Sequence, residues 1–192
     1  MSDKYHHGDL RNALIEEGIK MINTSGEDSL SMRKLAEKCG VSMAAPYAHF
    51  KNKEEMINAI KKYVEDAFTE YLEAAVNKAE ADVESKIVAL GIAYVSFFID
   101  NPEYFTFLFS RGYVHLNLDF KSSDENIFKP FKLLKDLCSR YFDEKKPGIS
   151  DYEKELDIIR IWSSVQGVTS IIFMQNVKWS RDWKQEIVNI IH

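Results

Sequence analysis

A chain of 192 residues, 45% of them hydrophobic and 29% charged, has the composition of a folded globular protein with one or two domains. Four prolines and eight glycines leave no room for a long flexible linker or a low-complexity segment. The formal net charge of -5 argues against a generally basic protein that coats nucleic acid, so any DNA-binding surface must be local.

The first predicted helix begins near Asp9, which can cap it, and runs to about Asn23, with Gly26 ending it. Its apolar residues recur on one helical face, at Leu14, Ile15, Ile19 and Ile22. His6 and His7 precede the helix, but no cysteine or carboxylate stands at ligand spacing from them. A solvated arm is therefore a better interpretation than a metal site.

A helix, a tight turn and a second short helix are predicted within Leu30–Lys53. Ser31 can cap the first helix, because its hydroxyl can accept hydrogen bonds from backbone N–H groups that lack an intrahelical partner. Gly40 stands where this helix must end, since glycine enters the left-handed region at little cost. Val41 is expected to be the buried residue of the turn, and Ser42 is expected to cap the second helix.

The second helix, SMAAPYAH, has the features of a helix that enters the major groove of DNA. Its alanines at 44, 45 and 48 give it the thin profile that suits a groove about 12 Å wide. Pro46 lies in its first turn, where the missing N–H costs little. The alternative interpretation is a helical corner that never meets DNA, because such corners are common in proteins.

Three segments, HGDLRNALIEEG, LSMRKLAEKCGVS and YAHFKNKEEMINAI, resemble the DNA-binding domain of TetR-type transcriptional regulators. The resemblance extends from about Tyr5 to Ile60, and its most specific part is GVS followed by Tyr-x-His-Phe and a lysine. It implies that three residues contact phosphates, namely Tyr47, His49 and Lys53. It also implies that four residues face bases, namely Ser42, Met43, Ala44 and Ala45.

Ser31 and Arg33 complete the predicted set of DNA-contacting residues. Basic residues bracket the proposed recognition helix, at Arg33, Lys34, Lys38, Lys51 and Lys53. Ala48 stands where relatives often carry an arginine or an aromatic residue, so one common contact is absent. Over the first sixty residues the acids slightly outnumber the bases, which predicts weak non-specific affinity for DNA.

A long helix from Glu54 to about Ala79 is predicted to follow, with Asn52 and Glu55 at its cap. We place the domain boundary within it, so that residues 1–62 form a helix-turn-helix DNA-binding domain and residues 63–192 form a helical ligand-binding and dimerisation domain. The predicted fold class is all-α: an N-terminal three-helix helix-turn-helix domain joined by a long helix to a C-terminal helical domain.

The next helices are marked by caps and breaks. Asp82 can open a helix that Asn101-Pro102 interrupts, and the short helix PEYFTFLFS then follows. Residues 111–121 are expected to be irregular. A further helix is predicted from Ser123 or Asp124 onward, with a bend at Pro130.

The last two helices are predicted to form a dimer interface. Ser150 and Glu153 form a capping box for the first of them, which is expected to reach Val177, and Ser180 can cap the second. The stretch 161–177 carries no charge, yet it is too polar and short to span a membrane, so burial on more than one side is expected. A second copy of the chain would supply that cover. The predicted interface residues are Val165, Val168, Thr169, Ile172, Trp183, Ile187 and Ile190.

Aromatic residues are dense between Tyr94 and Trp162, a pattern that fits either plain core packing or a ligand pocket between helices. The segment WSSVQGV resembles the W-x-x-x-H-G signature of one TetR-type ligand-domain subfamily, with Gln166 in place of the usual histidine. The predicted pocket residues are Tyr94, Phe98, Phe105, Phe109, Phe131, Trp162 and Gln166. Because Gln166 offers only a neutral donor and acceptor, a small apolar or weakly polar effector is expected.

The motifs of common enzyme classes are absent, including G-x-S-x-G, the P-loop and H-E-x-x-H, so neither catalysis nor a cofactor or metal is expected. Cys39 and Cys138 form no CxxC pair and no secretory signal precedes them, which favours reduced thiols in the cytoplasm. With the resemblance, these observations imply a homodimeric repressor that binds a palindromic operator, is released by a small molecule and has no membrane partner. The alternative is a dimeric DNA-binding or protein-interaction module without an effector.

Overall fold

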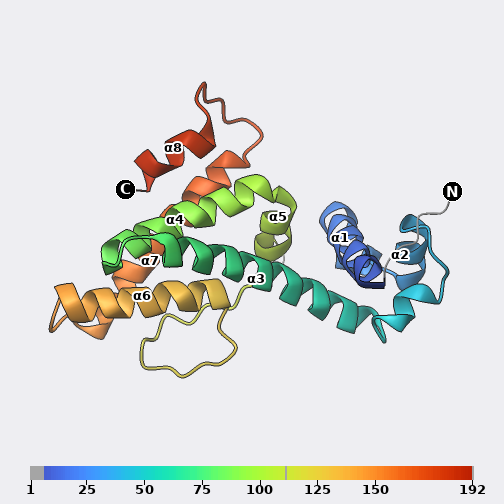
Figure 1. The fold of residues 1–192 in the computed structure, drawn as a ribbon, viewed down its shortest axis with the longest axis horizontal. Helices are drawn as coiled ribbons and strands as arrows, with labels where there is room; N and C mark the ends of the chain where they lie inside the picture. Colours follow the sequence, from blue (N-terminus) through green and yellow to red (C-terminus); the bar gives the residue numbers. More distant parts are fainter. Residues whose placement is uncertain (1–6, 111, 192) are drawn as a thin grey trace. The chain divides into compact units, whose positions relative to one another are not determined.

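The computed structural model describes residues 7–110 and 112–191, and in these residues it contains α-helices and two short 3-10 helices, η1 and η2, but no β-strand (Figure 1). The predicted all-α class is confirmed. Contacts divide the chain into two units. The amino-terminal unit comprises residues 1–64 and 103–113, and the carboxy-terminal unit comprises residues 65–102 and 114–192. The division therefore falls within one long helix, and residues 103–113 group with a part of the chain far away in sequence.

The amino-terminal unit contains α1 (His7–Ser25), η1 (Glu27–Ser29), α2 (Met32–Lys38), η2 (Ala45–Ala48), the first half of α3 (Lys53–Lys78) and nearly all of α5 (Pro102–Ser110). The apolar face predicted for α1 forms the core of this unit, since Leu14, Ile15, Ile19 and Ile22 are fully buried. A Cβ atom at Gly18 would lie only 2.8 Å from Ile60 Cδ1, so this glycine permits the close approach of α1 and α3. The helix begins two residues before the predicted cap, Asp9, whose side chain lies outside the described residues.

The predicted end of α2 is confirmed, and its turn is a Schellman arrangement. The Ser31 hydroxyl accepts a hydrogen bond from the Lys34 N–H at 3.1 Å, so Ser31 is the cap. Gly40 has a φ of 65°, and the next N–H, that of Val41, donates to the carbonyl five residues earlier at 3.0 Å. The expected burial of Val41 is wrong. Val41 stays half-buried, and Pro46 is the buried residue of this segment.

The second helix of the pair is shorter than predicted. It is the 3-10 helix η2, and Ser42 does not cap it with its side chain; instead, the Ser42 carbonyl accepts from the Ala45 N–H at 3.0 Å. Pro46 has no N–H to donate to an α-helical bond, and the N–H of Tyr47 bonds the carbonyl three residues earlier at 3.1 Å. The proline therefore favours the tighter 3-10 turn in this short segment.

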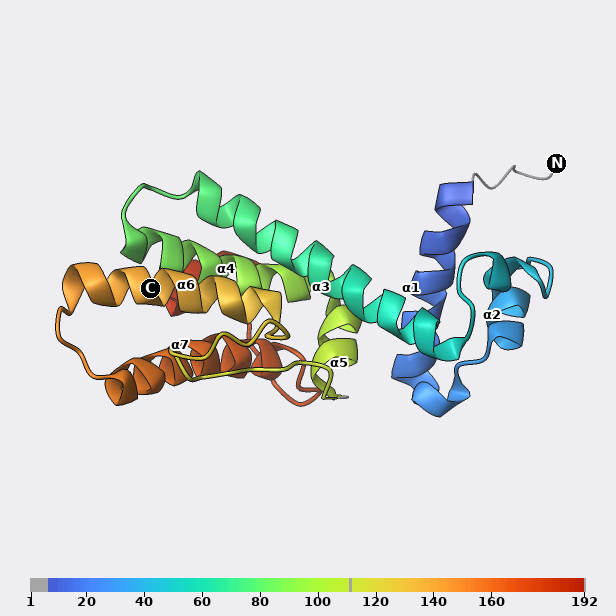
Figure 2. The same cartoon turned by 90° about the horizontal axis from the view of Figure 1, so that it is seen from below.

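The carboxy-terminal unit contains the second half of α3, α4 (Val83–Asp100), α6 (Lys129–Lys145), α7 (Asp151–Ile172) and α8 (Trp183–Ile190). Helix α4 is central in this unit, because it packs against α6, α7 and α8, while α6 also packs against α7 (Figures 1 and 2). Aromatic and aliphatic side chains from these helices form the interior of the unit.

Several predicted helix boundaries are confirmed by hydrogen bonds. The Asn52 carboxamide and the Asp82 carboxylate each accept a backbone N–H three residues later, at 2.8 and 2.9 Å. Ser150 and Glu153 form the complete capping box at the start of α7. Helix α4 ends at Asn101-Pro102, where the proline disfavours helical geometry in the residue before it.

Two predicted helix starts are wrong. Helix α6 begins at Lys129 rather than at Ser123 or Asp124, and Pro130 lies in its first turn instead of bending it. This position suits proline, because the first helical N–H groups have no intrahelical partner to lose. Helix α8 is capped by Asp182 rather than by the residue at 180, since its carboxylate accepts the N–H groups at 184 and 185.

The charge-free stretch of α7 is buried on one side only, which corrects the expectation of burial on several sides. Val165 and Thr169 are buried within the unit, whereas Ser163, Gly167 and Ile171 are exposed. The helix also ends five residues before the predicted Val177. Within residues 7–110 and 112–191, no helix has the length and apolar character that a bilayer crossing requires.

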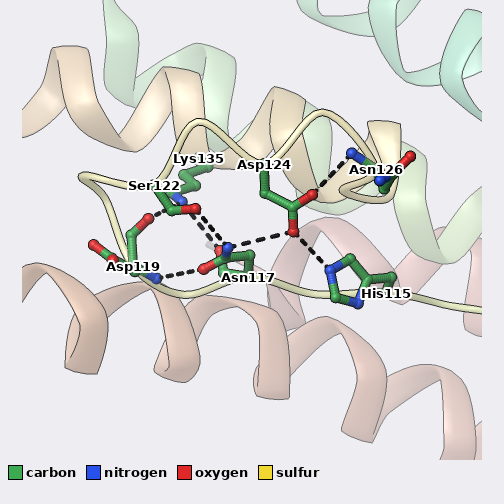
Figure 3. A network of polar contacts seen from close by, with 7 residues as sticks. All are labelled: His115, Asn117, Asp119, Ser122, Asp124, Asn126 and Lys135. Atoms are coloured by element: carbon green, nitrogen blue, oxygen red, sulfur yellow. Dashed lines mark hydrogen bonds and ion pairs between the residues drawn. The ribbon is translucent and has the colours of Figure 1, made fainter.

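The segment between α5 and α6 is irregular, as predicted for its first part, but it is held by a network of polar contacts (Figure 3). The His115 imidazole lies 2.7 Å from the Asp124 carboxylate. The ammonium group of Lys135, on α6, donates to the backbone carbonyls of Asn117 at 3.1 Å and Asp119 at 2.5 Å. Burial lowers the pKa of Lys135, and these two carbonyls solvate its charge in place of water.

Candidate functional site

The predicted recognition segment presents its side chains to solvent. Met43 is 51% exposed and Tyr47 is 56% exposed, and Ser42 and Ala44 are exposed beside them. A cluster of exposed apolar side chains commonly marks a surface that binds a partner. Two residues of the segment and its end, Pro46 and Phe50, are buried and hold it against the rest of the unit.

Three cations near this segment are available to a partner. Arg33 and Lys51 are exposed and Lys53 is half-buried, and none of them forms an ion pair with another residue in the described ranges. Lys38 differs, because its ammonium lies 3.0 Å from a carboxylate oxygen of Glu17. The structure therefore separates cations that can meet phosphate from one that is already neutralised.

The remaining predicted contact residues are less exposed. Ser31, Ala45 and His49 are half-buried, and the hydroxyl of Ser31 already accepts the capping hydrogen bond. The His49 ring lies 6.2 Å from the ring of Phe50, which holds it at the edge of the unit's core. These residues border the exposed segment rather than forming its centre.

Helix α5 contributes contacts to the amino-terminal unit that no sequence pattern indicated. The Tyr104 hydroxyl donates to the Glu16 carboxylate at 2.6 Å, and the Asn23 side chain donates to the Glu103 carbonyl at 2.8 Å. The Tyr104 ring also meets the ring of Tyr63 edge-on at 6.4 Å. Burial and the neighbouring Glu16 carboxylate together raise the pKa of Tyr104, so its hydroxyl remains a donor.

An aromatic cluster lies inside the carboxy-terminal unit, formed by Phe68, Tyr94, Phe98, Phe131 and Trp162. The ring of Trp162 lies 5.4 Å from that of Tyr94 and 5.1 Å from that of Phe131. Phe98 lies 5.2 Å from Tyr94 and 4.6 Å from Phe68. These contacts bring together four residues of the predicted pocket from α4, α6 and α7.

The other two aromatic residues of the predicted pocket group with the amino-terminal unit. Phe105 and Phe109 are on α5 and belong to the amino-terminal unit, where their rings lie 5.1 Å apart. The sequence placed them in the set because they follow helical spacing, which does not identify the neighbour that a helix packs against.

Two buried polar atoms stand out in the helices that form the cluster. The hydroxyl oxygen of Tyr94 and Oε1 of Gln166 are buried and have no hydrogen-bond partner among the described residues. An unsatisfied buried polar group costs about 1–3 kcal/mol, and most buried groups in proteins have a partner. Burial also raises the pKa of Tyr94, so its phenol is neutral.

The predicted dimer residues divide into inner and outer sets. Val165, Thr169 and Ile187 are buried within the unit's own fold, and so they offer no free surface. Val168, Ile172 and Trp183 are half-buried, and Ile190 is 37% exposed. A second set of apolar residues, which shares only Ile190 with the predicted set, is exposed on α7, on α8 and between them. We call it the α7–α8 face: Ile159, Ile171, Met174, Val177, Trp179, Val188 and Ile190. A Cβ atom at Gly167, on the same side of α7, would meet no atom within 4 Å.

A groove of about 790 Å³ lies between α4, α6 and α7 and was not predicted. Its apolar lining includes Ile87, Ile92 and Ile161, and its charged lining includes Lys146 and Arg160, which both bind the Asp157 carboxylate at 2.7 and 2.6 Å. The aliphatic residues of α4 that line it, Ile87, Val88 and Ile92, are half-buried.

Comparison with known proteins identifies the domain that carries the exposed segment. Residues 14–60 match the sequence model of the family described as bacterial regulatory proteins, tetR family. This segment is therefore similar to TetR-type domains. A region of 50 residues is also 40% identical to the tetracycline repressor protein class C of Escherichia coli, covering 26% of this chain and 23% of that protein. The chain thus matches about a quarter of the length of that curated relative.

The whole fold is similar to those of solved TetR-like regulators. A putative tetR family transcription regulator from a Shewanella species has a TM-score of 0.68 and 15% identity, with 94% of each chain covered. The regulator FadR from Bacillus subtilis, solved in complex with stearoyl-CoA, has a TM-score of 0.68 and 16% identity, covering 94% of this chain and 95% of that one. At these identities the similarity establishes the fold, and the functional residues must be argued from this chain.

Proposed function

We propose that the protein is a homodimeric transcriptional regulator, a repressor that binds a palindromic operator and is released from it by a small molecule. The observation that carries the proposal is the TetR-type match over residues 14–60, together with the exposure of Met43 and Tyr47 beside unpaired cations. We propose residues 1–62 as the DNA-binding domain and residues 63–192 as the domain for ligand binding and dimerisation.

The proposed DNA contacts divide into positioning and reading. Tyr47, His49 and Lys53 contact phosphates, a role that suits a hydroxyl, an imidazole and a cation but carries no sequence information. Met43 and its neighbours from Ser42 to Ala45 face the base edges. Because several of these side chains are apolar, contact with thymine methyl groups is the natural mode of reading.

The proposed dimer uses the α7–α8 face. Seven exposed apolar residues on adjoining elements are unusual for a surface that meets only water, and a second copy would cover them. Gly167, with no neighbour near its Cα, would let the partner's helix approach closely. The DNA-binding domains of two subunits linked in this way can bind two half-sites about 34 Å apart.

The proposed effector site is the aromatic cluster together with Gln166. The stearoyl-CoA complex of FadR supports the idea that a fold of this kind can take up an apolar ligand. The resemblance of WSSVQGV to the W-x-x-x-H-G signature points to the same helix, and a glutamine there makes release independent of protonation at this position. Effector coupling to operator affinity is expected to be about 1–3 kcal/mol, or roughly 5- to 150-fold.

Selection of bound sequences from a random pool of double-stranded DNA tests the proposal directly. The full-length protein should enrich a palindrome whose half-sites are separated by about one helical turn, with an affinity that falls steeply as salt rises. Enrichment of no common sequence would contradict the proposal. With the operator known, candidate effectors are titrated into the protein–operator complex. Ligands that bind tightly yet leave operator affinity unchanged would favour the alternative, a DNA-binding or protein-interaction module without an effector.

A further inference from the structure

We infer that the effector carries a neutral hydroxyl group, which hydrogen-bonds both the Tyr94 hydroxyl and the Gln166 carboxamide beside the aromatic cluster. This inference rests on the proposed function, and it names the chemical class of the ligand: an alcohol or phenol with an apolar body. An organic anion or cation would be buried at the same place without a counter-charge.

The two orphaned atoms come from helices that pack against each other. Tyr94 lies on α4 and its ring contacts that of Trp162 on α7 at 5.4 Å. Gln166 follows Trp162 by four residues on α7, so the two side chains lie on the same side of that helix, one turn apart. Both orphaned atoms are therefore close to one tryptophan, and a single small group in this region is the simplest way to satisfy them.

The required group must both accept and donate a hydrogen bond. The Tyr94 hydroxyl has a proton to donate, and Oε1 of Gln166 can only accept. A hydroxyl group meets both requirements at once, and it still does so if the carboxamide turns its nitrogen toward the ligand. A ketone or an ether has no proton for Gln166. An ammonium group could donate to both oxygen atoms, but its charge would be buried there without a counter-charge, which is unfavourable.

Charge excludes the common alternative, a carboxylate. The stretches Leu90–Phe98 of α4 and Ile161–Ile172 of α7 contain no charged residue. The buried cation of α6, Lys135, points its ammonium at the carbonyls of the segment between α5 and α6 (Figure 3). A carboxylate would thus be buried without a cation, which is unfavourable.

The first experiment measures thermal unfolding of the full-length protein without ligand. Tyr94→Phe should leave Tm unchanged or raise it by about 2–4 °C, because it removes an unsatisfied hydroxyl and no hydrogen bond. Tyr152→Phe is the matched control, since Tyr152 is 68% exposed in the same unit, and it should leave Tm unchanged. A clear fall in Tm for Tyr94→Phe would show that an ordered water already satisfies the hydroxyl, and this would overturn the inference.

The second experiment measures binding of 1-alkanols from hexanol to decanol, of the matching carboxylates, and of stearoyl-CoA, by calorimetry and by quenching of tryptophan fluorescence. The alcohols should bind saturably and more tightly than the carboxylates of equal length. Tyr94→Phe and Gln166→Leu should each weaken alcohol binding by roughly 2- to 12-fold, the loss expected for one hydrogen bond. Tyr152→Phe should bind like the wild type.

Three results would overturn the inference. The first is tighter binding of carboxylates or of stearoyl-CoA than of alcohols, and the second is alcohol binding that Tyr94→Phe does not weaken. The third is alcohol binding that is lost only in Ile87→Asp, because this would place the ligand in the groove between α4, α6 and α7. Operator binding by the wild type without any probe is measured in parallel. Its failure would contradict the proposed function, whereas failure of the alcohol tests with intact operator binding would contradict the ligand class alone.

Discussion

The two units present their candidate functional residues in opposite ways. In the amino-terminal unit, Met43 and Tyr47 are more than half exposed, and they lie within one short segment of the chain. In the carboxy-terminal unit, Tyr94 is fully buried, its ring contacts that of Trp162, and Trp162 contacts Phe131, so the three residues come from three helices. A partner as large as DNA can be bound by exposed side chains on a surface, whereas a small molecule is bound by side chains that enclose it.

This difference sets how mutations act. A change at an exposed reading residue removes a contact with the partner and leaves the fold nearly unaffected, because surface substitutions usually cost little stability. A change in the aromatic cluster alters packing and ligand binding together, since cores are close-packed. The following predictions test whether mutations in the amino-terminal unit change binding without changing stability, and whether mutations in the carboxy-terminal unit change both.

The largest effect is expected from Ile171→Glu on the α7–α8 face. Burying this carboxylate in a dimer interface without a partner should cost at least about 3 kcal/mol, or more than roughly 100-fold in dimer affinity. Sedimentation should show a monomer, and operator binding should fall in parallel. Leu118→Glu is the control, because Leu118 is also an exposed apolar residue of this unit but lies outside the face. A wild-type monomer that binds a palindrome tightly would contradict the dimer.

A smaller effect is expected from Tyr104→Phe. This variant loses the hydrogen bond to Glu16 and should destabilise the amino-terminal unit by about 1–2 kcal/mol, because the acceptor is charged and only partly buried. Thermal unfolding followed by circular dichroism measures the loss. Tyr47→Phe provides the contrast, since its exposed hydroxyl should not affect stability, although it should weaken operator binding. Equal Tm values for Tyr104→Phe and the wild type would show that the contact contributes nothing.

Lys53→Ala should change electrostatics alone. Loss of one phosphate contact should reduce the slope of log K against log salt by about one unit and weaken all DNA sequences similarly. Met43→Ala should instead alter base preference without changing that slope. Lys145→Ala removes the same charge from an exposed position of the other unit, outside the α7–α8 face, and serves as the control. An unchanged slope for Lys53→Ala would contradict the proposed docking.

The smallest effect is expected from thiol chemistry. Burial, together with the Asp157 carboxylate, raises the pKa of Cys138 to about 12, and burial also raises the pKa of Cys39. Both thiols are therefore neutral at pH 8, and mild oxidation should leave operator affinity within about twofold. Because the folded state favours the neutral Cys138 thiol, its contribution to stability is complete below pH 9 and is lost as pH rises toward 12. A large loss of operator binding on oxidation would reveal a redox switch.

Features with a local signal were predictable from the sequence. The capping box of Ser150 and Glu153, the cap at Ser31 and the turn at Gly40 all depend on residues within a few positions of each other, and all are present. The same locality explains why the DNA-binding segment was recognisable. The errors at Ser42 and Pro130 arose where one residue allows two local geometries, and the surrounding chain selects one.

Features that depend on distant contacts were not predictable. The bond between Tyr104 and Glu16 joins residues 88 positions apart, and no periodicity in either segment indicates it. The same holds for Lys135, whose apparent role as a surface charge of α6 changes once the segment before α6 supplies carbonyl groups to it. In the predicted pocket set, the rings of Tyr94 and Phe131 each contact that of Trp162, because each residue lies on the apolar face of its helix, and a role in ligand binding stays a prediction.

The grouping of residues 103–113 with the amino-terminal unit has a consequence for protein engineering. A DNA-binding module cut after residue 64 would lack Tyr104 and the Glu103 carbonyl, which hydrogen-bond Glu16 and Asn23. Chimaeras that exchange DNA-binding domains between regulators at a single junction in α3 would therefore pair one protein's α1 with another protein's α5. Grafts that transfer both stretches of sequence together should keep these contacts, so a chimaera built from this chain would need two junctions rather than one.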